Sequence, residues 1–76
     1  MTYSLIIKHH QSDPTYVNGI KTWDDVLDYL KNKLDQWTIG VNIYKYSSND
    51  RLLGERNVTM GNLWDIANSK NDKVLL

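Results

Sequence analysis

Two stretches of this chain carry apolar residues at helical spacing, and each follows two stretches with the composition of β-strands. The order strand, strand, helix therefore occurs twice within 76 residues. Helices and sheets each bury one apolar side, so elements in this order pack as two layers around one core. We predict an α+β two-layer sandwich, in which an antiparallel sheet of about four strands carries both helices on one face.

The first helix is predicted over residues 22–35. Its apolar positions follow the i, i+3, i+4, i+7 pattern of a helix with one buried side. These positions are Trp23, Val26, Leu27, Leu30, Leu34 and Trp37. Thr22 is suited to cap the first backbone amides, and Asp25 occupies the reciprocal position of a capping box. Asp24, Asp25 and Asp28 lie near the positive end of the helix dipole, where carboxylates are stabilising.

The second helix is predicted over residues 60–69, with Thr59 at its start. Its apolar spacing is the same but shorter. The residues that carry it are Met60, Leu63, Trp64 and Ala67. Gly61 weakens the first turn, because glycine has a low helix propensity.

Strands are predicted where β-branched and aromatic residues alternate with polar ones. The four segments are residues 3–10, 16–21, 38–47 and 51–58. The second segment contains Asn18-Gly19, which is also typical of a tight turn, so that strand has an alternative. Residues 73–76 are expected to add a short strand or a tail.

The two halves align when the chain is shifted by 37 residues. This shift pairs Ile6 with Ile43 and Thr22 with Thr59. Internal repeats of this kind indicate duplicated supersecondary units. We expect a single domain over residues 1–76, built from half-units of about 1–37 and 38–76.

The sheet face away from the helices is the predicted interaction surface. Ile39, Val41 and Ile43 are expected to face the helices, which turns Asn42, Tyr44 and Tyr46 outward, because successive strand residues point to opposite faces. An uncovered face with aromatic and aliphatic side chains is typical of an interaction site.

The first strand has two possible registries. The 37-residue repeat would turn Leu5, Ile7 and His9 to the outer side and Ile6 inward. In the other registry Tyr3, Leu5 and Ile7 face the core. A slip of one residue exchanges the two faces, so this strand alone leaves both open.

The residues needed for catalysis or metal binding are sparse. The chain has no cysteine and two histidines. His9 and His10 are neighbours on a predicted strand, so they point to opposite faces and do not share a metal. The four glycines are dispersed and form no phosphate loop. We therefore expect no enzymatic activity, no cofactor and no metal.

Net charge and hydropathy argue against two kinds of partner, duplex DNA and membranes. The net charge is zero, whereas duplex-DNA binders need an excess of Lys and Arg. No apolar run is long enough to span a membrane. No secretory signal is visible, and a small secreted protein would usually carry disulfides. A cytoplasmic location is expected.

These features together predict a small intracellular protein-binding module without enzymatic activity, which inhibits or adapts a larger protein. The Asn- and Lys-rich composition favours a phage or mobile-element accessory protein. The predicted partner-binding residues are Tyr44, Tyr46, His9, Asp24, Asp25 and Asp28. A homodimer is a further option. The alternative function is weak binding of single-stranded nucleic acid through the same sheet face.

Overall fold

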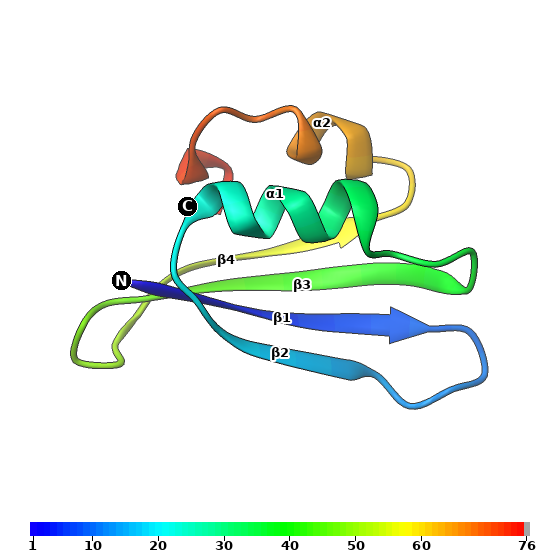
Figure 1. Cartoon of the computed structure of the whole chain (residues 1–76), viewed down its shortest axis with the longest axis horizontal. Coiled ribbons are helices and arrows are strands. Elements are labelled where there is room, and N and C mark those ends of the chain that lie inside the picture. The colour runs from blue at the N-terminus through cyan, green and yellow to red at the C-terminus, as the bar shows by residue number, and fades with distance from the viewer. Residues whose placement is uncertain (76) are drawn as a thin grey trace.

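A computed structural model of the protein describes residues 1–75 and confirms the α+β fold, with a four-stranded antiparallel sheet and two α-helices (Figure 1). Its elements in chain order are β1 (Thr2–His9), β2 (Thr15–Ile20), α1 (Trp23–Asn32), β3 (Thr38–Tyr46), β4 (Leu52–Thr59), α2 (Leu63–Ala67) and the short 3-10 helix η1 (Asp72–Leu75). The order strand, strand, helix thus occurs twice, as the sequence predicts.

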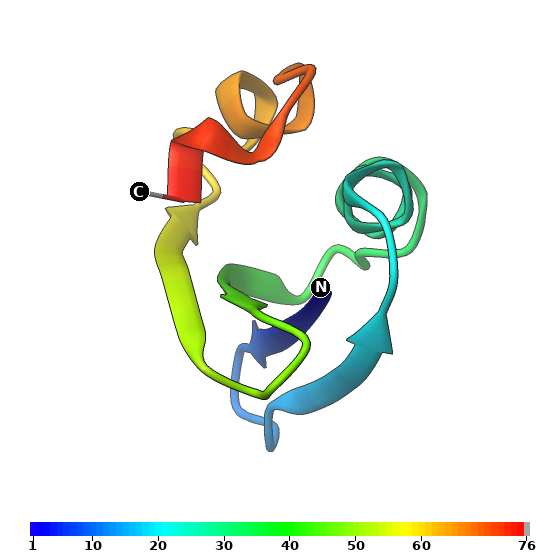
Figure 2. The same cartoon turned by 90° about the vertical axis from the view of Figure 1, so that its left-hand side faces the viewer.

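The strands lie in the order β2-β1-β3-β4, so β1 and β3 form the centre and the two hairpins lie side by side. All neighbouring pairs are antiparallel. The helices cover one face of the sheet. Figure 2 shows that the sheet is curved, with α1 above the β2 side and with α2 and η1 above the β4 side. The edge strands β2 and β4 each have one side without a neighbouring strand among the described residues.

The buried side of β1 is the one that carries Tyr3, Leu5 and Ile7. Of the two registries, the second is therefore correct, and Leu5 and Ile7 do not belong to the outer side. The 37-residue shift fails here because it aligns Leu5 with Asn42, whereas Leu5 pairs with Ile43 and shares its buried face. The buried apolar side chains of β1 and of β3 stand at odd-numbered positions in both strands, so a shift by 37 residues aligns buried positions with outer ones.

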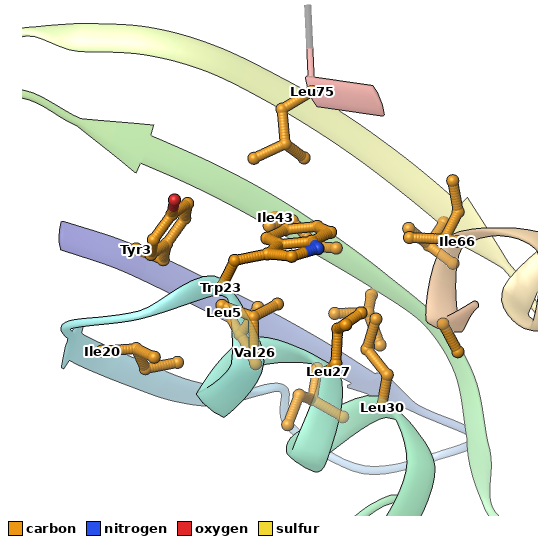
Figure 3. Packing of buried hydrophobic residues seen from close by; sticks show 14 residues of the cluster. Tyr3, Leu5, Ile20, Trp23, Val26, Leu27, Leu30, Ile43, Ile66 and Leu75 are labelled. Atoms are coloured by element: carbon orange, nitrogen blue, oxygen red, sulfur yellow. The ribbon is translucent and has the colours of Figure 1, made fainter. Parts of the chain in front are cut away.

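Trp23 lies in the middle of the core between the sheet and the C-terminal segment (Figure 3). Its ring centroid is 5.8 Å from that of Tyr3. Its indole Nε1 donates a 3.1 Å hydrogen bond to the carbonyl of Ser69. A buried Trp is favourable when its N–H has such a partner. The other buried apolar residues are Tyr3, Leu5, Ile7, Ile20, Val26, Leu27, Leu30, Val41, Ile43, Val58, Ile66, Ala67 and Leu75.

α1 begins as predicted, because Thr22 Oγ1 accepts a 3.1 Å hydrogen bond from the backbone N–H of Asp25. The helix ends at Asn32, and Asp35 then forms a turn by accepting a 2.9 Å bond from the N–H of Trp37. The prediction that Trp37 is buried is therefore wrong. Its side chain is 58% exposed, since helical spacing no longer applies after the helix ends.

α2 is shorter than predicted, because residues 60–62 form a turn in which Asn62 Oδ1 accepts a 2.8 Å hydrogen bond from the N–H of Thr59. Ile66 and Ala67 are buried against the core. Trp64 is 67% exposed, so its predicted place on the buried face is wrong, and Met60 is exposed as well. The buried side of α2 follows Leu63, Ile66 and Ala67 at spacing i, i+3, i+4, which leaves Trp64 on the other side of the helix.

Three bulges change the alternation, and in the one between β3 and β4 the extra residue is Leu53. Between β1 and β3 the register shifts so that Ile39 is the extra residue, and this side chain is 53% exposed where it was predicted to face the helices. In β2, Asn18 and Gly19 form the third bulge opposite Ser4, with Gly19 at φ 74°, and the chain continues as a strand. Residues 73–75 lie in η1 and not in a strand, and the last residue of that prediction lies outside the described part.

Candidate protein-interaction surface

The outer face is the side of the sheet opposite α1, α2 and η1. The strand register places its residues in rows of cross-strand neighbours. The rows are Lys8, Gly40 and Thr59; Tyr16, Ile6, Asn42 and Asn57; Ser4, Tyr44 and Glu55; and Thr2, Tyr46 and Leu52. No helix of the described residues covers this side (Figure 2). The face is therefore open to a partner.

Three tyrosines dominate the outer face. Tyr44 and Tyr46 are half-buried and are consecutive outward-facing residues of β3. They lie at the end of the strand, after the buried Val41 and Ile43. Tyr16 lies across Ile6 on β2 and is 65% exposed. Tyrosine combines a large apolar ring with a hydrogen-bonding hydroxyl, which is why it is frequent at interfaces.

Asn42 is the least satisfied polar residue of this face. Its Nδ2 donates a 3.3 Å hydrogen bond to the hydroxyl of Tyr44. Its Oδ1 is shielded from solvent and accepts no hydrogen bond from any residue that the structure describes. A buried acceptor without a donor is costly, so a small movement of Tyr44 that let Asn42 reach a donor would be favourable.

Two polar hollows flank the tyrosines of β3. The first, toward β4, is lined by Asn42, Tyr44, Glu55, Arg56 and Asn57 and has a volume of about 620 Å³. The second, toward β2, is lined by Thr2, Ser4, Asn18, Gly19, Tyr46 and Asp50. Both hollows offer hydrogen-bond donors and acceptors beside aromatic rings. Such a mixture suits a hydrated protein interface.

His9 lies away from the tyrosines, at the far end of β1. Its Nε2 is 2.8 Å from Thr15 Oγ1, and its Nδ1 is 3.8 Å from Asp35 Oδ1. The ring thus connects the β1–β2 hairpin with the turn that follows α1. The prediction that His9 shares the outer face with Tyr44 and Tyr46 is wrong, because the face assignment of β1 is reversed.

The three aspartates of α1 also lie apart from the tyrosines, since α1 covers the opposite face of the sheet (Figure 1). Asp28 accepts a 2.8 Å hydrogen bond from Asn32 Nδ2 and lies 3.5 Å from Lys33 Nζ. These two contacts lower the pKa of Asp28 below its ordinary value. Asp24 and Asp25 are exposed and have no ion-pair partner in the described part of the chain.

The six predicted partner-binding residues therefore occupy three separate places. Only Tyr44 and Tyr46 lie together, and the partner-binding role of all six stays a prediction. The sequence did not single out Tyr16 as a residue of the outer face, and it placed Ile6 there only in the second registry of β1. Val17 is partly buried and Tyr16 is its neighbour in β2, so alternation along the strand turns Tyr16 outward. This could be predicted only by choosing the strand over the alternative turn at Asn18-Gly19.

Within residues 1–75, no three His, Asp or Glu side chains lie close enough together to hold a metal ion. In the same part of the chain, no helix is long and apolar enough to cross a membrane.

Comparisons with protein-family models, with curated proteins and with solved structures found no match for this chain.

Proposed function

We propose that this chain is a small cytoplasmic protein-binding module without enzymatic activity, which inhibits or adapts a larger protein. Its composition, rich in Asn and Lys, supports a source in a phage or another mobile element. The outer face is the proposed binding surface, with Tyr44 and Tyr46 at its centre and Tyr16 at its β2 side.

One observation carries the proposal. A helix-free sheet face presents three tyrosines and Ile6, with a polar hollow on each side of the β3 tyrosines. Interfaces derive most of their affinity from a few large amphipathic anchors surrounded by hydrogen-bonding groups.

The charges of this face favour a protein over a nucleic acid. Glu55 and Arg56 both line the first hollow, and Asp50 lines the second. A surface that follows a phosphate backbone needs a continuous excess of cations. Mixed charges, together with a net charge of zero for the chain, give no such excess.

The proposal is tested by affinity capture from a lysate of the source organism, followed by mass spectrometry and titration of the retained protein. We expect Y44A/Y46A and Y16A to weaken that partner, each by about tenfold or more, as for interface anchors. W64A is the matched control, because Trp64 is an exposed aromatic residue on α2, away from the sheet. Thermal unfolding of each variant checks that the fold is intact.

Oligonucleotide binding at moderate salt distinguishes the protein-binding function from the nucleic-acid-binding alternative. A mixed-sequence single-stranded oligonucleotide is titrated at about 0.15 M salt, where non-specific binders have dissociation constants near 10⁻⁴ M. We expect no tighter binding than that. Tight oligonucleotide binding that Y44A/Y46A abolishes would contradict the proposal and favour the nucleic-acid function. A partner that binds Y44A/Y46A and wild type equally would remove the outer face from the interface, and light scattering tests the homodimer as another use of this face.

A further inference from the structure

β2 is an open edge of the sheet. The strand order leaves one side of β2 without a neighbouring strand in the described residues. Such an edge presents a row of unpaired backbone N–H and C=O groups, which are complementary to another extended backbone.

The two edges of the sheet differ in charge. β2 carries no charged side chain between Thr15 and Ile20, whereas the other edge strand, β4, carries Glu55 and Arg56. Charged residues on an edge strand oppose the addition of a further strand. β2 is therefore the edge that is better suited to accept one.

A groove runs beside this edge, between β2 and α1. Its floor comes from β2 and its wall from α1, and it has a volume of about 390 Å³. The lining residues are Val17, Asn18, Gly19, Ile20, Lys21, Asp25, Asp28, Tyr29 and Lys33. Val17 and Tyr29 are partly buried and pack against the core, so they form the apolar part of the groove.

Some of the charged side chains that line the groove are paired with one another. Lys33 Nζ lies 3.5 Å from Asp28 Oδ2 and 4.6 Å from the ring centre of Tyr29, so these charges are engaged. Asp25 lines the groove without an ion pair in the described residues, and Lys21 lies at the same end. A bound segment would therefore meet one free carboxylate near the start of α1.

We propose that an extended peptide segment of a partner protein adds to the β2 edge as a fifth strand and places alternate side chains in the groove under α1. The side chains on the helix side would contact Val17 and Tyr29 and should be apolar. Those on the other side would lie beside Tyr16 and continue the outer face. The inference goes beyond the proposed outer-face interaction, because its main recognition element is the backbone edge.

The test uses ¹⁵N-labelled full-length protein and the capped peptide acetyl-Lys-Thr-Val-Thr-Val-Thr-Lys-amide. We expect amide shift changes and slower hydrogen exchange at residues 15–21, with shift changes at Asp25 and Tyr29. Two further peptides are N-methylated, one at both valines and the other at all three threonines. Only one of the two should lose affinity, by about tenfold or more, because only alternate amides of an added strand point to the edge.

A matched pair of variants tests the groove. Asp24 and Asp25 are neighbouring exposed residues in the first turn of α1, but only Asp25 lines the groove. D25K should weaken the peptide by about fivefold or more, and D24K by less than about twofold, because a contact ion pair is lost only in D25K. Y44A/Y46A should bind the peptide as wild type does. Failure of the proposed outer-face interaction can therefore be distinguished from failure of the edge-strand inference.

Several outcomes would overturn the inference. These are no shift changes at millimolar peptide, changes centred on β4 or on Tyr44 and Tyr46, equal effects of D24K and D25K, or equal affinity of both N-methylated peptides. Concentration-dependent changes at residues 15–21 without peptide would also overturn it, since a second copy of the chain would then occupy the edge.

Discussion

The phenolic hydroxyl of Tyr3 donates a 2.6 Å hydrogen bond to Oδ2 of Asp72, which connects the first strand to the C-terminal 3-10 helix across 69 residues. Lys45 Nζ lies 2.6 Å from the same oxygen. Leu75, three residues later, is buried in the core. The C-terminal segment is thus held by a polar cluster and an apolar anchor, both formed with residues distant in sequence.

This cluster predicts a pH window of stability. The contacts with Lys45 and Tyr3 lower the pKa of Asp72, so their contribution is present above the ordinary value of 3.8 and is lost as pH falls through the lowered pKa. Burial, with the nearby Asp72 carboxylate, raises the pKa of Tyr3 to about 12. The contribution of the protonated Tyr3 to stability is present below pH 10, its ordinary pKa, and is lost as pH rises through about 12.

The measurement is the free energy of unfolding in urea as a function of pH. Near neutral pH, D72N should lower it by about 1–3 kcal/mol, because the Lys45 ammonium loses its charged partner. D72N should also flatten the acid limb, and Y3F should flatten part of the alkaline limb. If D72N leaves the acid part of the stability–pH curve unchanged and Y3F leaves the alkaline part unchanged, other groups control the pH dependence.

Gly54 should tolerate no side chain. A Cβ at this position would lie 2.6 Å from the backbone carbonyl oxygen of Leu75. G54A should therefore displace the C-terminal segment and cost about 1–3 kcal/mol, as overpacking does. G61A is the control, since a Cβ there has no contact closer than 3.7 Å, and it should be neutral or stabilising by up to about 1 kcal/mol. Equal thermal midpoints for the two variants would contradict this packing.

The two faces of α1 should respond differently to truncation. Leu27 is buried, and L27A should lower the free energy of unfolding by about 2–5 kcal/mol, a large share of the total for so small a domain. Asp28 is exposed, and D28A should lower the free energy of unfolding far less than L27A does. Chemical denaturation of both variants measures the difference, and equal shifts of the midpoint would mean that the helix faces are assigned wrongly.

The three tryptophans should differ in fluorescence quenching by acrylamide. Trp37 and Trp64 are exposed and should be quenched efficiently, whereas Trp23 is shielded. A protein with W37F and W64F should therefore retain a weakly quenched, blue-shifted emission. W23F should leave only accessible emission and should destabilise the fold, because the bond to the carbonyl of Ser69 is lost. Strong quenching of Trp23 in the double variant would place it at the surface.

The sequence by itself determined the kinds of elements and their order. The spacing of Trp23, Val26, Leu27 and Leu30 specifies one buried helical side, and Thr22 specifies where the helix begins. The alternation of β3 separates Val41 and Ile43 from Tyr44 and Tyr46. These features depend on neighbours within a few residues, so local periodicity is sufficient to predict them.

Only the tertiary structure decided which side of β1 is buried, and hence which residues form the candidate surface. The alternation of Tyr3, Leu5 and Ile7 with Ser4 and Lys8 is compatible with the observed side, but the apolar Ile6 and the 37-residue repeat point to the other side. The choice therefore depends on the pairing with β3. Trp37 is exposed because α1 ends early, and Ile39 is exposed because of a bulge. Trp64 is exposed because α2 packs on the core through Leu63, Ile66 and Ala67. A shift of one residue at such a point reverses or rotates every side chain that follows, and its energy is set by contacts distant in sequence.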